Sequence, residues 1–497
     1  MSFMGLDLGG SGAKASIYAE DGSSIAASKM PYTFVAPRPD WREYDPQTVL
    51  AALMRAIQAV TSTPAVRRDP VRAIGISVAA EAVVPVGADG TPLYNTIASF
   101  DTRGSEYLPL LGELLGEEEL YRITGQPLDH LYSLMRILWF RDYMPSVFAK
   151  AEKFHLWQEL VLARLGIEPA LEYSNAARTM AFDIGSRVWS EPILRAVDVP
   201  ADLFAPLVPS GSLVGCVATR QADELGVPRN CPVVAGAMDQ SCASLGLGVV
   251  DPTLTAVGTG SVEAVDIPLE DREALAAQAR HFLYVTPYAP GGLLGSAHHF
   301  TAGSAVEWYR NLVGATSYDD LYGGRAPEIG APSSLLVLPQ FAGSFVPARD
   351  AAARAAIIGL SLSTSANDIA RALLEGLVFE LRLTMETMEG AGLRVGEVRN
   401  GGGGAHSETW MRLKATALGR AIAVPASLDS SSLGAALLAA VGVGVFADCR
   451  SAAASMVHIK QRYEPEGAAV AAFAERYQEY CAMRERLAAE RGTPMRR

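Results

Sequence analysis

The sequence predicts an α/β protein with two lobes that face each other across a cleft. The chain has 497 residues, more than a single core usually organises, since about 150 residues form a typical domain. Residues 4–18 and residues 254–265 share one pattern: an apolar strand, a turn of Gly, Ser and Thr, and a second apolar strand. Each pattern opens one half of the chain, as a duplicated fold requires. Between them an apolar strand ends at Asp239, and open α/β sheets bind ligands beyond such strand ends.

The composition excludes several classes of protein. Hydrophobic residues make up 49% of the chain and charged residues 19%, which is typical of a globular protein and not of a disordered one. The formal net charge is -12 and no block rich in Lys and Arg occurs, so we expect a small-molecule ligand and no nucleic acid.

Compartment signals point to the cytoplasm. The 5 cysteines are odd in number and never form a C-x-x-C pair, which argues against a disulfide framework and a zinc site. The N-terminus lacks the basic and apolar regions of a signal peptide. The longest apolar run, residues 434–447, is shorter than the roughly 20 residues that span a bilayer, so we expect no membrane association.

The N-terminal stretch MGLDLGGSGAKASIY predicts a strand, a turn and a second strand, because the apolar residues keep a period of two after the glycines. A dinucleotide-binding fingerprint would open a helix there, so a dehydrogenase is disfavoured, and no P-loop motif occurs. Two interpretations of the turn stay open. Either it is an ordinary hairpin with Asp7 at a strand end, or Asp7 holds a metal while the turn wraps a phosphate with Gly9, Gly10, Ser11 and Gly12.

The next segments predict a helix, a strand and two acids that each follow an apolar run. Residues 46–61 have helical spacing, and residues 71–78 form an apolar strand that runs into Glu81. A second apolar run precedes Asp101 and Arg103. Both acids therefore fall at the carboxyl edge of a sheet, where carboxylates accept hydrogen bonds from sugar hydroxyls. The alternative is that they are solvated loop acids.

The central stretch, residues 231–265, joins a base candidate to a phosphate site. Asp239 follows the apolar run of residues 232–235. Further along, the turn Gly258-Thr259-Gly260-Ser261 offers unhindered backbone N–H groups and two hydroxyls, which suit phosphate oxygens.

Three later features complete the pattern. A helix over residues 304–313 begins behind small residues, which suits a phosphate or nucleotide, and residues 398–404 predict a strand and a Gly-rich turn before another helix. The pair His298-His299 suggests a metal site, but adjacent strand residues point in opposite directions. The helix that starts at residues 429–432 is so rich in Ala and Gly that we expect another element to pack closely against it.

Seven motifs, in this order and spacing, resemble the FGGY carbohydrate kinases, the family that includes glycerol kinase and xylulokinase. They cover roughly residues 4 to 445 and read GLDLGGSGAK, FDTRG, GAMDQ, VGTGSVE, TAGSAVEWYRN, NGGGGAHSETW and SSSLGAALLA.

The resemblance implies two actin-like (ribonuclease H-like) domains, residues 1–247 with the sugar site and residues 248–497 with the ATP site, closing on a central cleft. It implies an ATP- and Mg²⁺-dependent kinase of a sugar or polyol such as a ketopentose, tetritol or pentitol. Family members often form oligomers, which allows a homodimer.

The resemblance also implies roles for individual residues. Asp239 is similar to the catalytic base, and Asp7 with Asp239 to the carboxylates near Mg²⁺. The implied substrate contacts are Glu81, Asp101, Arg103, Asp239 and Gln240. The implied ATP contacts are Gly10, Ser11, Gly12, Lys14, Gly258, Thr259, Gly260, Gly303, Glu307, Gly403, Gly404 and Ala405. Such a site agrees with the needs of phosphoryl transfer, which are positioning, a metal to spread charge, a base and the exclusion of water.

The sequence departs from both named relatives around the sugar site. Ala79, Ala80, Ser99 and Met238 replace residues of other sizes, so no single substrate follows from the resemblance. Glu81 matches the glycerol kinase branch, which hints at a polyol or ketose bound through its terminal hydroxyls. A different hypothesis is an actin-like nucleotide-binding regulatory protein without sugar turnover, but such a scaffold has no need of a carboxylate at residue 239.

Overall fold

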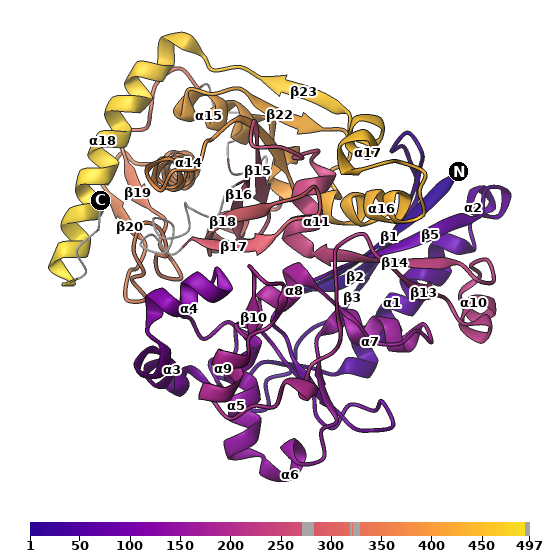
Figure 1. The fold of residues 1–497 in the computed structure, drawn as a ribbon. Helices are drawn as coiled ribbons and strands as arrows, with labels where there is room; N and C mark the ends of the chain where they lie inside the picture. The colour runs from indigo at the N-terminus through magenta and orange to yellow at the C-terminus, as the bar shows by residue number, and fades with distance from the viewer. Residues whose placement is uncertain (271–282, 319–320, 322–328, 493–497) are drawn as a thin grey trace.

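Two mixed β-sheets organise the chain, one in each half (Figure 1). The computed structural model describes residues 1–270, 283–318, 321 and 329–492. The first sheet has the strand order β13 (Leu213–Cys216), β14 (Pro232–Met238), β5 (Val71–Val78), β1 (Ser2–Gly9), β2 (Gly12–Ala19) and β3 (Ser24–Pro31). The second has the order β17 (Tyr284–Pro287), β18 (Leu293–His299), β16 (Glu263–Leu269), β15 (Leu254–Thr259), β21 (Glu397–Gly401), β22 (Ile422–Pro425) and β23 (Ile459–Tyr463).

The two sheets repeat one topology, which confirms the predicted duplication. In the first, β3, β2 and β1 are antiparallel neighbours, and β5 and β14 continue parallel to β1. In the second, β18, β16 and β15 are antiparallel, and β21 and β22 continue in parallel. The predicted hairpins are therefore β1–β2 and β15–β16, in equivalent places. The two halves thus follow one plan, and in the first sheet the carboxyl ends of the parallel strands β1, β5 and β14 lie at one edge.

Helices cover the sheets and fill the space between them. Those around the first sheet are α1 (Pro46–Thr61), α2 (Pro64–Arg68), α7 (Trp157–Arg164), α10 (Thr219–Leu225) and α11 (Asp239–Gly246). Those of the second half are α13 (Gly303–Val313), α14 (Ala366–Gly390), α15 (Glu408–Leu418), α16 (Ser430–Gly442), α17 (Cys449–Met456) and α18 (Gly467–Glu490). The predicted helix at residues 46–61 agrees with α1, which starts because the Asp45 side chain accepts hydrogen bonds from the Gln47 and Thr48 amides.

An insertion in the first half forms the lower part of the molecule in Figure 1. It contains α3 (Leu108–Leu115), α4 (Glu117–Thr124), α5 (Ser133–Tyr143), α6 (Pro145–Phe148), α8 (Tyr173–Ala177) and α9 (Glu191–Ala196). Short two-stranded pairs accompany these helices: β4 (Glu43–Tyr44) with β7 (Thr96–Ile97), β6 (Val84–Val86) with β8 (Lys153–His155), β9 (Leu171–Glu172) with β12 (Leu207–Val208), and β10 (Phe182–Asp183) with β11 (Val188–Trp189). In the second half, β19 (Leu336–Leu338) pairs with β20 (Ala356–Ile358).

Helix α16 belongs to the second half of the sequence but packs on the first sheet, against β1, β5 and α11. The contact is backbone against backbone. A Cβ on Gly5 would lie 1.8 Å from the Ser432 carbonyl oxygen, and one on Gly75 would lie 1.9 Å from that of Ala435. This close approach is what the Ala- and Gly-rich sequence of α16 predicts.

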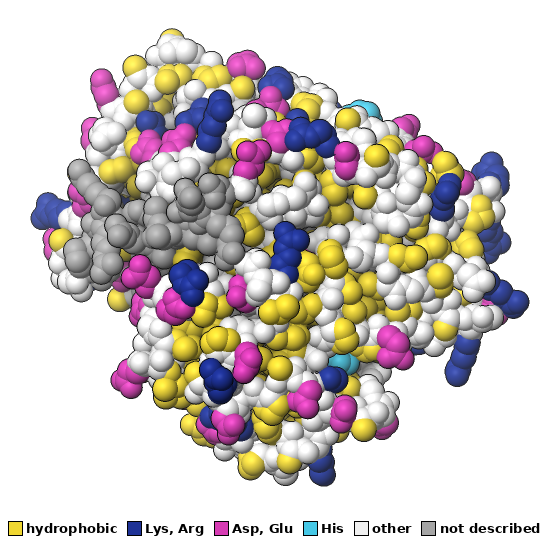
Figure 2. All heavy atoms as spheres, in the orientation of Figure 1, with side chains coloured by type: hydrophobic (Ala, Val, Ile, Leu, Met, Phe, Trp, Pro, Cys, Tyr) yellow, Lys and Arg dark blue, Asp and Glu magenta, His cyan; other side chains and the backbone are white. Residues whose placement is uncertain are grey.

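The outer surface mixes charges of both signs. On the face shown in Figure 2, the Lys and Arg side chains drawn in colour are scattered among Asp and Glu. None of the helices that the structure describes is long and apolar enough to span a bilayer.

One buried acid of α7 gives a stability prediction. Glu159 is 0% exposed, its Oε2 accepts a hydrogen bond from the Leu156 amide at 3.1 Å, and no hydrogen bond reaches its Oε1 in the described chain. Burial raises the pKa of Glu159 from 4.5 to about 8. The folded protein therefore keeps a proton that the unfolded chain loses, so stability falls as the pH rises from about 4.5 to about 8.

Glu159→Gln is expected to remove this loss, because the amide stays neutral at every pH. At pH 8 the variant should be more stable than the wild type by about 4 kcal/mol, and the difference should shrink toward pH 4.5. Thermal or urea unfolding at a series of pH values measures it. Parallel stability curves for the two proteins across this range would contradict the assignment.

Candidate functional site

A cavity of about 360 Å³ lies at the carboxyl ends of β1, β5 and β14. We call it the base cavity, because Asp239 lines it. Both halves of the chain contribute to its walls: Gly9, Gly10, Tyr32, Tyr44, Ala79, Ala80, Glu81, Ala82, Ser99, Phe100, Leu131, Trp157, Arg178, Met238, Asp239 and Gln240 from the first, and Val262, His298 and Phe300 from the second. Carboxylate, guanidinium and amide groups thus face aromatic and small apolar side chains, which suits a small polyhydroxylated molecule.

Asp239 is the first residue of α11 and follows β14 directly. Burial raises its pKa to about 7, and the negative charges of Asp7 and Glu81 add to the rise. Its Oδ1 accepts a hydrogen bond of 2.8 Å from the Gln240 amide. A carboxylate with a pKa near neutrality can take up a proton during a reaction at physiological pH.

Glu81 is held in the base cavity by Arg178. The Glu81 backbone is left-handed, with φ of 69°, and its Oε1 accepts from Arg178 Nε at 2.6 Å. The guanidinium lies 4.3 Å from the centre of the Tyr284 ring, and its Nη1 donates to Gln126 Oε1 at 2.7 Å. Sequence reasoning missed Arg178, because its partner lies 97 residues away and no local pattern marks the ion pair.

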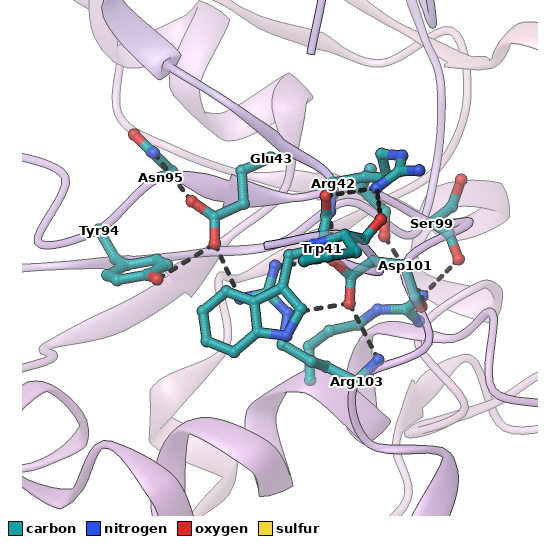
Figure 3. A network of polar contacts seen from close by, with 11 residues as sticks. Trp41, Arg42, Glu43, Tyr94, Asn95, Ser99, Asp101 and Arg103 are labelled. Atoms are coloured by element: carbon teal, nitrogen blue, oxygen red, sulfur yellow. Dashed lines mark hydrogen bonds and ion pairs between the residues drawn. The ribbon is translucent and has the colours of Figure 1, made fainter. Parts of the chain in front are cut away.

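Asp101 and Arg103 do not line the base cavity, contrary to the contact that the resemblance implies. Asp101 is 0% exposed and forms an ion pair of 2.7 Å with Arg103, whose Nη1 binds Glu43 Oε1 at 2.8 Å (Figure 3). The guanidinium also lies 4.0 Å from the centre of the Trp41 ring. These charges compensate one another inside the first lobe. The Asp101–Arg103 ion pair therefore stabilises the fold near the base cavity without lining it.

The four departures noted around the sugar site all line the base cavity. They are Ala79, Ala80, Ser99 and Met238. Because three of the four side chains are small, the cavity wall here is shaped largely by backbone and by the neighbouring Phe100 ring. The departures noted in the sequence therefore shape this cavity and not a remote surface.

The β1–β2 hairpin places Asp7 and Lys14 beside Asp239. Lys14 Nζ lies 3.3 Å from Asp7 Oδ2 and 3.0 Å from Asp429 Oδ1, just before α16. Burial raises the pKa of Asp7, although the Lys14 charge opposes the rise. Ser11 is exposed at the tip of the hairpin, whereas Gly12 is buried.

A second cavity, of about 430 Å³, adjoins the hairpin. It is lined by Lys14, Ser16, Ala27, Ser28, Lys29, Gly402, Gly403, His406, Leu428 and Asp429. Two lysines line it, and Lys14 is paired there with the Asp429 carboxylate, so this cavity holds charges of both signs.

The donor chemistry near Asp239 fits Mg²⁺. Mg²⁺ in nucleotide enzymes binds through one or two carboxylates, water and phosphate oxygens. Asp7 and Asp239 offer two carboxylates whose charges interact. Among the described residues, no three or more His, Cys, Asp or Glu side chains are grouped so that they could hold a metal ion by themselves.

The largest of these cavities, about 1060 Å³, lies in the second lobe at the N-terminus of α13. We call it the nucleotide cavity. It brings together five residues predicted for ATP, namely Gly260, Gly303, Glu307, Gly403 and Gly404. Ser261, from the predicted phosphate turn, also lines it. The ATP contacts implied by the resemblance did not include the remaining lining residues: Ser304, Val306, Ser317, Tyr318, Leu374, His406, Ser407, Glu408, Thr409 and Trp410. Gly403 and His406 also line the second cavity, so the two spaces adjoin.

Gly258, Thr259 and Ala405 do not line the nucleotide cavity, contrary to their predicted roles. Thr259 is still part of β15 and is 0% exposed. Its hydroxyl donates to Glu263 Oε1 at 2.7 Å and accepts from Lys414 Nζ at 2.6 Å. Ser261, the second hydroxyl-bearing residue of the predicted turn, follows the end of β15 and lines the cavity.

Comparison with known proteins finds one family over nearly the whole chain. Residues 2–246 match the FGGY family of carbohydrate kinases, N-terminal domain, and residues 255–443 match the C-terminal domain of that family. A glycerol kinase of Halorhodospira halophila is 28% identical, with 89% of this chain and 88% of the relative covered. A xylulose kinase of Staphylococcus epidermidis is 27% identical, with 93% and 92% covered. The crystal structure of a xyloylose kinase from Brucella ovis is similar at a TM-score of 0.88 and 26% identity, with 98% of this chain and all of that chain, 100%, covered.

Proposed function

The chain belongs to the FGGY family of carbohydrate kinases, and from this premise we propose that Asp239 is the general base with which it phosphorylates a small, uncharged sugar or polyol. The family assignment makes the protein an ATP- and Mg²⁺-dependent phosphotransferase with two actin-like domains. What we add is the base, the residues that bind each ligand and the class of acceptor. The observation that carries the proposal is the place of Asp239, at the base cavity and beside the Asp7–Lys14 hairpin.

Asp239 supports in-line transfer by accepting the proton of the attacking hydroxyl. Phosphoryl transfer requires positioning and charge stabilisation, and a base within reach of the nucleophile. The pKa of about 7 keeps Asp239 near the balance between its ionised and protonated forms, which suits a base that must take up and release a proton in every cycle.

The acceptor is a ketopentose, tetritol, pentitol or similar compound. Glu81 accepts hydrogen bonds from its hydroxyls, and Gln240 lies beside the base. Arg178 already neutralises Glu81, with the two groups 2.5 Å apart, so this guanidinium is not free to pair with an acidic sugar. The relatives named glycerol kinase and xylulose kinase bracket this range of acceptors.

The nucleotide cavity takes the adenosine, with Gly260, Gly303, Glu307, Gly403 and Gly404 around it. Glycines at these positions let a flat ring and phosphates approach the backbone closely. The phosphates then extend past the β1–β2 hairpin, where Gly10, Ser11, Gly12 and Lys14 lie. Asp7 and Asp239 would hold Mg²⁺, which spreads the negative charge of the phosphates when bound.

A coupled ADP-release assay tests this function. Mg-ATP is supplied with a panel of ketopentoses, pentitols, tetritols, glycerol and deoxy sugars, and Asp239→Asn is run alongside. Stimulation by one compound, lost in the variant, supports both the base and the acceptor class. ATP binding without stimulation by any compound would contradict the acceptor class and favour a nucleotide-binding regulatory protein. The homodimer stays a prediction, which light scattering can test.

Glu81→Ala is expected to raise the KM for the sugar about 10- to 30-fold and to leave the KM for ATP nearly unchanged, because a charged hydrogen-bond acceptor is lost on the sugar side only. Steady-state kinetics with each substrate varied in turn measures the two constants. Glu106→Ala, an exposed acid of the same lobe, is the matched control. Equal changes in both KM values would place Glu81 outside the sugar site.

A further inference from the structure

The pair His298-His299 at the end of β18 divides between two environments. His299 points into the second lobe, where its Nε2 lies 2.5 Å from Thr384 Oγ1 and its Nδ1 lies 3.7 Å from Glu380 Oε2. His298 points the other way and lines the base cavity. The two imidazoles therefore do not converge on one metal, and the described residues provide no third ligand. His298 needs another explanation.

His298 joins the two lobes at the floor of the base cavity. Its Nε2 contacts the Gln240 side-chain amide and lies 2.6 Å from Tyr284 Oη. The His298 ring stacks on the Tyr284 ring, with centres 4.8 Å apart. Tyr284 Oη donates in turn to Gln240 Oε1 at 2.7 Å. His298 and Tyr284 come from the second lobe, whereas Gln240 follows the base in the first.

These contacts fix which nitrogen of His298 carries the proton. The Tyr284 hydroxyl donates to Gln240 Oε1, so the Gln240 NH₂ group is left to donate to His298 Nε2. Burial and the nearby Arg178 charge lower the pKa of His298 to about 3, so the ring is neutral. A neutral imidazole whose Nε2 accepts must hold its proton on Nδ1. Among the residues that the structure describes, none accepts a hydrogen bond from that Nδ1–H.

We propose that His298 is a specificity-determining residue, whose Nδ1–H donates a hydrogen bond to a hydroxyl or carbonyl oxygen of the acceptor. The inference rests on the proposed sugar site. Glu81 offers an acceptor and His298 a donor, so the two residues read different atoms of one molecule. Because His298 comes from the second lobe, the oxygen it binds is recognised only when the lobes meet around the acceptor.

The test compares wild type, His298→Ala and His298→Gln on each acceptor that the wild type phosphorylates. The panel includes matched deoxy compounds, in which single oxygens are removed, and ketose–polyol pairs, which distinguish a carbonyl from a hydroxyl. His298→Ala should lower kcat/KM for the full acceptor about tenfold, as expected for a lost hydrogen bond between neutral groups. For one deoxy compound the wild type and His298→Ala should then be equal. His298→Gln, which retains an N–H donor, should recover part of the difference.

Controls separate this result from loss of folding and from failure of the proposed function. Thermal unfolding of each variant checks folding, and His458→Ala replaces an exposed histidine of the second half outside both cavities. If His298→Ala keeps the wild-type preference for every oxygen of the acceptor, the inference is wrong while the kinase function stands. If the wild type phosphorylates no compound of the panel, the proposed acceptor class fails, and this inference fails with it.

Discussion

Asp239→Asn is expected to lower kcat about 10²- to 10⁴-fold, the range that a positioned general base contributes. The substitution keeps the shape of the side chain and the hydrogen bond from the Gln240 amide to Oδ1, but it removes the oxygen that can accept a proton. The amide also lacks the charge that interacts with Asp7, so part of the loss reflects a weaker metal site. The Kd for ATP should stay within a few-fold, because the adenosine lies in the nucleotide cavity of the other lobe.

Single-turnover kinetics and calorimetric titration with ATP measure the two quantities separately. Asp223→Asn is the matched control, since Asp223 is an exposed carboxylate paired with Arg229 on the surface of the same lobe. Near-full activity of Asp239→Asn would show that another group takes the proton. A large loss of ATP affinity with unchanged kcat would assign the residue to binding alone.

Gly434→Ala is expected to have the second-largest effect, on both stability and kcat. Gly434 lies in α16, and a Cβ there would be 1.9 Å from the Cys242 carbonyl oxygen of α11. The two helices must move apart, which costs about 1 to 3 kcal/mol or more. Since α11 begins with Asp239, the base moves as well, and a displacement of about 1 Å lowers kcat about 10²-fold.

Gly112→Ala in α3 is the control for the chemical change itself. A Cβ at Gly112 meets only the Leu128 Cδ2 atom at 3.6 Å, an ordinary contact. Alanine favours a helix by about 1 kcal/mol over glycine, so this variant should be as stable as the wild type or slightly more stable. Thermal unfolding and kcat of both variants complete the comparison. If Gly434→Ala has the stability and kcat of the wild type, α11 and α16 can move apart at little cost.

Local patterns in the sequence were sufficient to predict much of the fold. The strand β5 begins and ends at the predicted residues, and so does α1. Both hairpins and the strand, turn and helix around Gly401–Gly404 were also predicted correctly, because periodicity and glycine turns act over a few residues. These elements carry Asp7 and three glycines of the nucleotide cavity, Gly260, Gly403 and Gly404.

The residues that were overlooked or wrongly placed are those whose partners lie far away in the sequence. Arg178 was overlooked because its partner Glu81 comes close only in the folded chain. Asp101 was predicted to face the ligand because it follows an apolar run, but Arg103 and Glu43 bury it instead. Thr259 was predicted to contact ATP for a similar reason, but its hydroxyl accepts a hydrogen bond from Lys414 of α15, which is distant in the sequence. A position at a strand end is local information, whereas the direction and partner of a side chain are not.

Because α16 packs on β1 and β5, the first sheet is completed only late in the synthesis of the chain. The last strand of that layer, β14, ends at Met238, but α16 starts only at Ser430. Ribosomes add about 5 to 20 residues per second, so the intervening segment takes roughly 10 to 40 s to make. During that interval Phe3, Ala73 and the glycines of the sheet lack the cover that α16 later provides. We therefore expect the nascent first lobe to expose apolar surface, of the kind that promotes aggregation, until nearly nine-tenths of the chain has been made.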